Sequence, residues 1–200
     1  MQKVLILDFG SQYTQLIARR VREAKVYCEI HPFDLSAERI RAIAPNAVIL
    51  SGGPASVYDE GAPAPSPAVF ELGVPMLGIC YGMGVLGQAD GGVMLRSDHR
   101  EYGKADLAVA NADDLFAGFA VGEPTTVWMS HGDRLEKLPA GWEPIASSPG
   151  SPLAAIRCVA KRRWAVQFHP EVVHSVRGRE ILENFLFRIG NLSADWTMDN

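Results

Sequence analysis

The sequence predicts an α/β fold, with an open and mostly parallel sheet, helices on its faces and an added antiparallel segment. Three patterns support this prediction. Short apolar runs alternate with helix-like segments up to Cys80, short β-like segments fill the second half, and an amphipathic stretch closes the chain. Strands that alternate with helices pair in parallel, because each crossover helix returns the chain to the end of the sheet where it began.

Four apolar runs in the first half predict buried strands, since a strand covered on both faces needs no polar residues. They are residues 4–7, 26–30, 47–50 and 75–79. Helices are predicted where apolar residues recur at helical spacing or where a capping residue precedes them. They are residues 12–24, a helix from the N-cap Ser36 to Ile43, and a short helix over residues 66–72.

The second half predicts antiparallel strands that extend or flank the sheet. Its β-like segments, separated by turn residues, are 101–110, 125–129, 143–146, 154–159 and 164–168. An amphipathic helix over residues 177–189 closes a domain that spans residues 1–190. Residues 191–200 form a tail without a further element, in which Trp196 and Met198 are typical of a surface that contacts another domain.

Composition and charge narrow the function classes. The 200 residues suit one domain, and the net charge of −4 without a basic run argues against a nucleic-acid partner. The N-terminal apolar run is too short for a membrane span and lacks a signal-peptide cleavage site, which predicts a cytoplasmic protein without a membrane partner. The 3 cysteines are widely spaced, so we expect neither a disulfide framework nor a metal site.

Cys80 is the first candidate catalytic residue. It follows a predicted strand and is flanked by Gly78 and Gly82, the spacing of a nucleophile elbow with sulfur in place of oxygen. The bend is crowded, so the flanking positions need residues without a Cβ. The partial positive charge at the start of the following helix favours a thiolate. The simpler alternative is a buried core thiol.

His169 is the candidate partner of that sulfur. It stands at the end of a predicted strand, and Pro170 biases it toward an extended backbone. Glu171, two residues further on, is placed to hold one ring nitrogen while the other faces the sulfur, as in a catalytic triad. Without Cys80, the same three residues would fit an ordinary loop histidine.

Two further motifs predict backbone groups around the substrate. The segment "LSGGP" ends the third strand, and acyl transfer through a thiolate needs N–H donors for an oxyanion. We expect these donors to be the N–H groups of Gly53 and of Tyr81, although a Gly-Gly-Pro segment also fits an ordinary turn. The segment "MSHGD" at residues 129–133 is predicted to be a polar turn that holds a polar substrate through its backbone.

Taken together, these motifs resemble the triad-type (class I) glutamine amidotransferases. Within that family the chain is similar to the glutaminase domains of GMP synthetases, in segments that extend from Asp8 to Phe187. They are "DFGSQYTQLIARRVRE", "SGGPASVYDEGAP", "GICYGM", "REYG", "MSHGDRL", "VQFHPEVVHS" and "ENFLF". The resemblance implies a flavodoxin-like sheet and hydrolysis of L-glutamine to glutamate and ammonia. It also implies a partner ATP-pyrophosphatase (synthetase) domain, with ATP and Mg²⁺ on that domain, that aminates adenylated XMP to GMP.

The resemblance assigns roles by position. It implies Cys80 as the nucleophile, His169 as the general acid and base, and Glu171 as the residue that orients the histidine. The oxyanion hole falls on Gly53 and Tyr81. Substrate contacts, mainly through backbone for the last two, fall on Gly52, Pro54, Gly84, Ser130 and His131. No cofactor is expected in this chain.

Three departures from the family pattern qualify these expectations. Gly84 stands where the family has a glutamine that contacts the substrate, which predicts weakened glutamine binding with the triad intact. Asp90 stands where the family has an apolar residue. The sequence ends at Asn200, whereas the family's longer enzymes continue into the synthetase domain, so we expect that domain on another chain or on a missing part of this one.

Two other functions fit the same motifs. One is a γ-glutamyl peptidase, a cysteine hydrolase on the same sheet that releases amino acids in place of ammonia. The other is a glutaminase of weakened activity that binds and regulates a synthetase, an interpretation that rests on Gly84. The choice of substrate and the reactivity of Cys80 distinguish the three.

Overall fold

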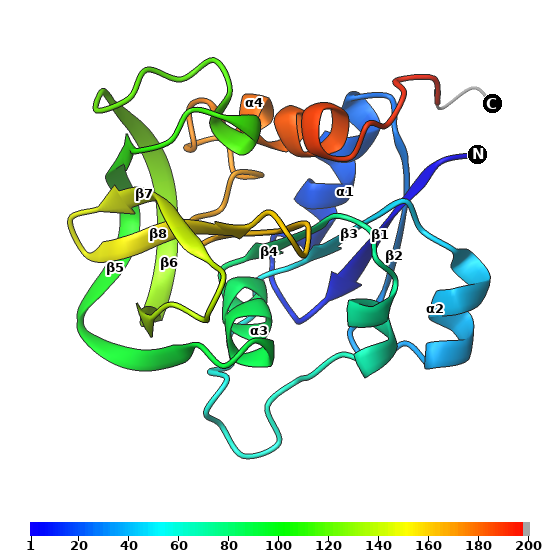
Figure 1. Ribbon diagram of the computed structural model, residues 1–200, viewed down its shortest axis with the longest axis horizontal. Coiled ribbons are helices and arrows are strands. Elements are labelled where there is room, and N and C mark those ends of the chain that lie inside the picture. Colours follow the sequence, from blue (N-terminus) through cyan, green and yellow to red (C-terminus); the bar gives the residue numbers. More distant parts are fainter. Residues whose placement is uncertain (198–200) are drawn as a thin grey trace.

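The structure is a computed structural model that describes residues 1–197, apart from the side chains of residues 95–99. Within this range the strands form one sheet in the order β2-β1-β3-β4-β9-β8-β7-β5-β6. Neighbours from β2 to β9 pair in parallel and the others pair antiparallel (Figure 1). The parallel strands are β1 (Lys3–Asp8), β2 (Tyr27–Pro32), β3 (Ala47–Leu50), β4 (Met76–Ile79) and β9 (Arg163–Val166). The predicted α/β fold is confirmed.

Helices cover both faces of the parallel strands. One face carries α1 (Thr14–Glu23) and α4 (Gly178–Glu183), and the other carries α2 (Ala37–Ile43) and α3 (Tyr81–Ala89) (Figure 1). Val4 packs in one core cluster with Ile17 of α1, and its neighbour Leu5 packs in the other with Ile40 of α2. Alternate side chains of a strand point to opposite faces, and both faces are covered here, so the buried residues of β1 and β3 are all apolar.

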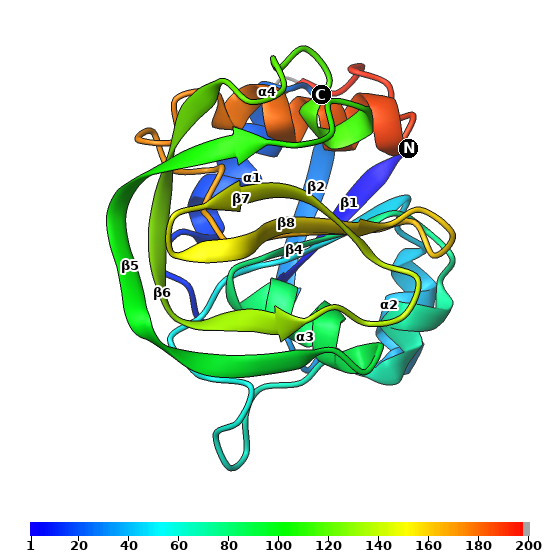
Figure 2. The ribbon, with the colours of Figure 1, turned by 60° about the vertical axis from the view of Figure 1, so that its left-hand side comes forward.

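The antiparallel half consists of long, curved strands. They are β5 (Val93–Val109), β6 (Pro124–Lys137), β7 (Glu143–Ser148) and β8 (Ser151–Cys158). Figure 2 shows β5 and β6 sweeping together around one side of the molecule. The predicted polar turn at residues 129–133 is wrong, because these residues lie inside β6. Their turn-like composition is overridden by pairing with β5, in which Glu101 lies opposite His131 and Tyr102 opposite Ser130.

Three other expectations need correction. The segment 164–168 is predicted to be an antiparallel strand, yet β9 pairs in parallel with β4 and antiparallel with β8. A strand can run parallel to one neighbour and antiparallel to the other. The periodicity of its own residues does not report the direction of either neighbour. The predicted helix over residues 177–189 is α4 in its first half and the π-helical turn η3 (Asn184–Ile189) in its second half. The predicted short helix over residues 66–72 is the 3-10 helix η1 (Pro67–Glu71). A second 3-10 turn, η2 (Asp114–Phe116), follows β5.

The tail packs on the domain more closely than its composition suggests. Leu192 is buried, and the Trp196 ring lies 5.8 Å from the ring of Tyr27. The Trp196 N–H donates to the carbonyl oxygen of Lys25 at 2.9 Å. Trp196 therefore contacts its own domain, whereas Met198 lies outside the described residues.

The described residues contain neither of two common features. None of their helices has both the length and the apolar character that a membrane crossing requires. No group of three or more His, Cys, Asp or Glu side chains among them is arranged to hold a metal ion.

Candidate active site

A cavity of about 650 Å³ opens at the carboxyl ends of the parallel strands. In open parallel sheets this edge collects the loops that follow each strand. Ten positions were singled out from the sequence, and eight of them line the cavity: Gly53, Pro54, Cys80, Tyr81, Gly84, Ser130, His131 and His169. The remaining two, Gly52 and Glu171, lie directly behind this lining and are buried.

Cys80 stands at a strained bend between β4 and α3. Its φ of 54° and ψ of −107° are unusual for a residue with a side chain. Its N–H donates to the carbonyl oxygen of Val166 in β9 at 2.8 Å, which fixes the bend to the sheet. A Cβ at Gly82 would lie 2.3 Å from the carbonyl oxygen of Leu50, and one at Gly78 would lie 2.5 Å from that of Gly82. Both flanking positions therefore require glycine.

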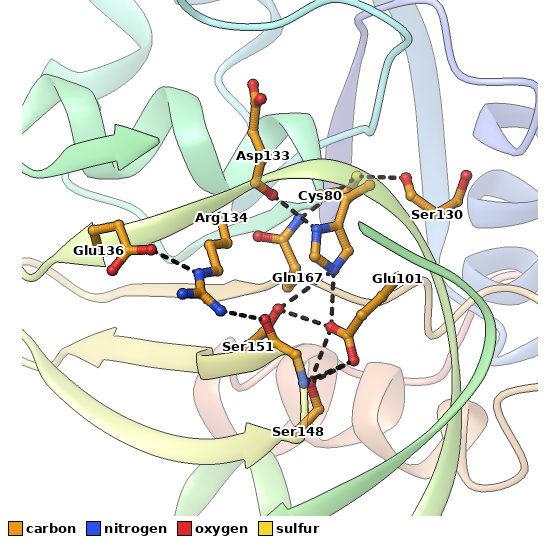
Figure 3. A network of polar contacts seen from close by, with 11 residues as sticks. Cys80, Glu101, Ser130, Asp133, Arg134, Glu136, Ser148, Ser151 and Gln167 are labelled. Atoms are coloured by element: carbon orange, nitrogen blue, oxygen red, sulfur yellow. Dashed lines mark hydrogen bonds and ion pairs between the residues drawn. The ribbon is translucent and has the colours of Figure 1, made fainter. Parts of the chain in front are cut away.

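The Cys80 sulfur has polar neighbours on two strands. It lies 3.5 Å from the carbonyl oxygen of Ser130 in β6 and 3.9 Å from Nε2 of Gln167, which follows β9 (Figure 3). The residue is only 7% exposed, yet it borders the cavity. A ligand in the cavity can therefore reach the sulfur.

His169 and Glu171 form a buried pair beside this sulfur. Nδ1 of His169 lies 3.0 Å from Oε2 of Glu171, whose side chain is 0% exposed. Burial acts to lower the pKa of His169, but the charge of Glu171 and the hydrogen bonds that the ring donates to the Cys80 and Glu171 side chains outweigh it. Together they raise the pKa from 6.5 to about 10. The raised pKa favours the protonated imidazole, which holds a proton that it can donate.

The backbone of Gly52 packs between the cysteine and the histidine. A Cβ at this position would lie 3.4 Å from Cβ of Cys80, 3.7 Å from Nε2 of His169 and 2.9 Å from Cε1 of the same ring. Only glycine leaves the two side chains space to face each other. The structure thus brings together three residues from β3, the β4–α3 bend and the end of β9.

Gly53 and Tyr81 place backbone groups on the cavity wall. A Cβ at Gly53 would lie 2.3 Å from the carbonyl oxygen of Phe9, so the close approach requires glycine. The Tyr81 N–H belongs to the first turn of α3, where N–H groups have no partner within the helix. The Tyr81 hydroxyl points elsewhere and donates to the carbonyl oxygen of Pro63 at 2.6 Å.

The His131 ring is held by a polar network rather than turned freely toward the cavity. Its Nδ1 lies 2.8 Å from the carbonyl oxygen of Asp133, and its Nε2 lies 3.1 Å from Oε1 of Glu101. The Glu101 carboxylate also accepts hydrogen bonds from the Ser148 and Ser151 hydroxyls (Figure 3). Both ring nitrogens therefore have hydrogen-bond partners within the domain.

Gly84 lies on the cavity side of α3. A Cβ there would lie 3.1 Å from Cγ1 of Val57 and 3.5 Å from Cε of Met94. These two apolar side chains occupy the space next to the missing side chain. The wall at this point therefore has no side-chain hydrogen-bonding group from position 84.

The cavity contains polar residues that the motifs did not single out. The Tyr13 ring contacts the His169 ring edge-on, with centroids 5.1 Å apart. The Ser56 hydroxyl donates to the Asp133 carboxylate at 2.5 Å, and Gln167 borders Cys80. Tyr13 follows the first strand, so its position at the carboxyl edge was a usable signal. The Ser56–Asp133 contact depends on a separation of 77 residues, and no local pattern reports it.

Most of the chain matches one known protein family. The model of the family "Glutamine amidotransferase class-I" matches residues 5–189. The chain belongs to this family. The resemblance to the class I glutamine amidotransferases is therefore confirmed at the level of the family.

Individual relatives refine this assignment. The chain is 54% identical over 197 residues to the GMP synthase [glutamine-hydrolyzing] of Desulfotalea psychrophila, covering 98% of this chain and 38% of the relative. The GMP synthase [glutamine-hydrolyzing] of Caldanaerobacter subterraneus subsp. tengcongensis is 52% identical, with 100% and 38% covered. This amidotransferase domain thus spans less than half the length of these relatives.

Solved structures share the fold. A candidate GMP synthase subunit from Thermoplasma acidophilum superimposes with a TM-score of 0.85 at 29% identity, covering 96% of this chain and 94% of that chain. A Thermotoga maritima glutamine amidotransferase gives a TM-score of 0.72 at 18% identity, covering 94% and 98%. The second likeness supports the fold alone.

Proposed function

We propose that this domain hydrolyses L-glutamine to glutamate and ammonia through Cys80, His169 and Glu171. The observation that carries the proposal is the placement of the Cys80 bend and the His169 ring at one cavity wall, with the buried Glu171 carboxylate behind that ring. A sulfur beside an imidazole that a carboxylate orients is the arrangement of covalent acyl transfer.

The proposed reaction proceeds in two steps. The Cys80 thiolate attacks the side-chain amide carbon of glutamine, and the oxyanion accepts hydrogen bonds from the N–H groups of Gly53 and Tyr81. His169 then gives its proton to the leaving nitrogen, so that ammonia departs and a γ-glutamyl thioester remains. In the second step His169 takes a proton from water, the resulting hydroxide attacks the thioester, and glutamate leaves as the sulfur is released.

The amino-acid end of the substrate is proposed to contact Ser130 and His131, mainly through backbone groups, with Pro54 on the cavity wall and Gly52 directly behind it. Support comes from the cavity, which Ser130 and His131 line, and from the engagement of both His131 ring nitrogens by Asp133 and Glu101. Gly84 contributes no side-chain contact. Binding of glutamine is therefore proposed to be weaker than in relatives with a glutamine at this position.

The ammonia is proposed to serve the synthesis of GMP. Support comes from the relatives named GMP synthase [glutamine-hydrolyzing], of which this chain spans 38%. The rest of those proteins is the proposed partner, an ATP-pyrophosphatase domain that uses ATP and Mg²⁺ to adenylate XMP and then aminates it to GMP.

An ammonia assay tests the proposal. Ammonia release from glutamine is measured for the wild type and for Cys80→Ala, with and without an added ATP-pyrophosphatase domain of a GMP synthetase. We expect release by the wild type and loss of release in the variant. Cys28→Ala is the matched control, since Cys28 is a buried cysteine whose sulfur contacts the carbonyl oxygen of Ala18 outside the cavity. Activity that survives Cys80→Ala, or release of amino acids from γ-glutamyl peptides without ammonia from glutamine, would overturn the proposal.

A further inference from the structure

Gln167 is a polar side chain in the cavity wall to which the proposed mechanism gives no task. It follows β9 directly, and its side chain reaches the wall that Cys80 and His169 also form. It is 2% exposed, and its own N–H donates to the carbonyl oxygen of Ala154 at 2.7 Å. The backbone bond and the burial together fix the position of its amide.

The sulfur of Cys80 lies between an acceptor and a donor. The Ser130 carbonyl oxygen at 3.5 Å can only accept, so it bonds a protonated sulfur. The Gln167 Nε2 at 3.9 Å can only donate, so it bonds the ionised sulfur (Figure 3). The two neighbours therefore favour opposite protonation states, and replacing the donor should shift the balance toward the thiol.

The other end of the same amide has no partner. Oε1 of Gln167 is buried and accepts no hydrogen bond from the part of the chain that the structure describes. A buried acceptor left unsatisfied costs stability, whereas an apolar side chain of similar size would avoid that cost. The contribution of Gln167 to folding therefore does not explain its presence, and unsatisfied groups of this kind point to a functional role.

The opposite orientation of the Gln167 side-chain amide, with Oε1 and Nε2 exchanged, would not stabilise an ionised sulfur. It would turn Oε1 toward the sulfur, where it repels a thiolate, and it would leave two buried N–H donors unsatisfied in place of one acceptor. The orientation with Nε2 on the sulfur is thus the one that suits an ionised nucleophile.

We infer that Gln167 is a positioning residue for the reaction: its amide N–H holds the ionised Cys80 sulfur in the attacking position. The inference rests on the proposed role of Cys80 as nucleophile. It assigns Gln167 a share of thiolate stabilisation alongside His169, and it explains why a buried amide is kept at the cost of an unsatisfied oxygen.

The rate of alkylation of Cys80 by iodoacetamide tests this inference without depending on glutamine. The rate is measured across pH on the full chain, with the site read by mass spectrometry. Gln167→Met keeps the length of the side chain and removes the donor, and Gln167→Glu keeps the shape and adds a negative charge. Gln88→Met, at an exposed position on α3, is the matched control.

We expect Gln167→Met to slow alkylation at neutral pH about tenfold, the effect of losing one hydrogen bond to a charged group. The rate should recover at alkaline pH, so that the profile moves to higher pH, and Gln167→Glu should move it further. The melting temperature of Gln167→Met should not fall, because an unsatisfied oxygen disappears. For glutamine hydrolysis, kcat should fall more than KM rises.

Three results overturn the inference. They are a Gln167→Met profile identical to that of Gln88→Met, an equal fall in rate at every pH together with a lower melting temperature, and recovery of the neutral-pH rate in Gln167→Glu. If Gln167→Met does not fold, the Gln167→Glu profile decides in the same way. A wild-type Cys80 that reacts no faster than Cys28 would instead overturn the proposed function itself, so the two failures are distinguishable.

Discussion

Nδ1 of His169 lies 3.0 Å from Oε2 of Glu171, and the second carboxylate oxygen of Glu171 has no hydrogen-bond partner among the described residues. The carboxylate is 0% exposed, so this imidazole provides its main electrostatic compensation. Breaking such a buried pair leaves a charge without a partner, which costs far more than breaking an exposed one.

Replacement of Glu171 by glutamine should lower the free energy of unfolding in a pH-dependent way. The pKa of His169 is raised from 6.5 to about 10 in the folded state, so the stabilisation is fully present below pH 6.5 and is lost as the pH rises through about 10. We expect Glu171→Gln to lower the free energy of unfolding by about 3 kcal/mol below pH 6.5 and by much less above a pH of about 10. Urea denaturation at both pH values measures the difference.

The control for this experiment is Glu180→Gln, which removes an exposed ion pair with Arg177. It should cost at most about 0.5 kcal/mol at either pH. A Glu171→Gln cost that stays constant between the two pH values would contradict the assignment of the raised pKa to this pair.

Two glycines of α3 should respond oppositely to alanine. A Cβ at Gly82 would lie 2.3 Å from a backbone oxygen, whereas one at Gly87 would lie 3.4 Å from Cδ1 of Leu135, an ordinary contact. Gly82→Ala should therefore lower the free energy of unfolding by about 3 kcal/mol or more and slow the alkylation of Cys80. Gly87→Ala should raise the free energy of unfolding by up to about 1 kcal/mol, because alanine favours the helix. Equal effects of the two changes would show that the bend is not crowded.

Restoring a side-chain amide at position 84 should strengthen glutamine binding. We expect Gly84→Gln to lower the KM for glutamine, with Val57 and Met94 moving slightly to admit the new side chain. Gly84→Ala adds the same Cβ without the amide, so it separates helix propensity from substrate contact. Steady-state ammonia release measures both variants, and a KM unchanged in Gly84→Gln would refute the idea that the glycine weakens binding.

Asp90 should stabilise the domain through a network that replaces the apolar residue of the family. Its carboxylate accepts hydrogen bonds from Trp142 at 2.7 Å and from Lys161 and Arg163 at 2.9 Å. Asp90→Leu leaves the buried Arg163 guanidinium without its carboxylate partner and should lower the free energy of unfolding by about 3 kcal/mol. Asp90→Leu combined with Arg163→Leu should recover much of this loss in thermal or urea unfolding, because no buried charge remains unpaired and Lys161 is half exposed. Strictly additive effects would contradict the coupling.

The local elements of this protein could be predicted well because their signals are local. The strand β3 (Ala47–Leu50) matches its apolar run, and the Ser36 hydroxyl accepts from the N–H of Arg39 as an N-cap should. The elbow around Cys80 was visible because two glycines at fixed spacing record a backbone clash that any side chain would create. Convergence of the site followed from topology, since parallel strands bring their carboxyl ends to one edge.

The sequence by itself determined the alternation of strands and helices, the bend that carries Cys80, and the motifs that place the site in a family. Only the tertiary structure decided that residues 129–133 continue β6, that His131 is held by Glu101, and that Gln167 reaches the sulfur. The reason is physical: turn, cap and periodicity preferences act over a few residues, whereas these contacts join positions 30 and 87 residues apart and depend on strand register. Register is set by the packing of the whole sheet.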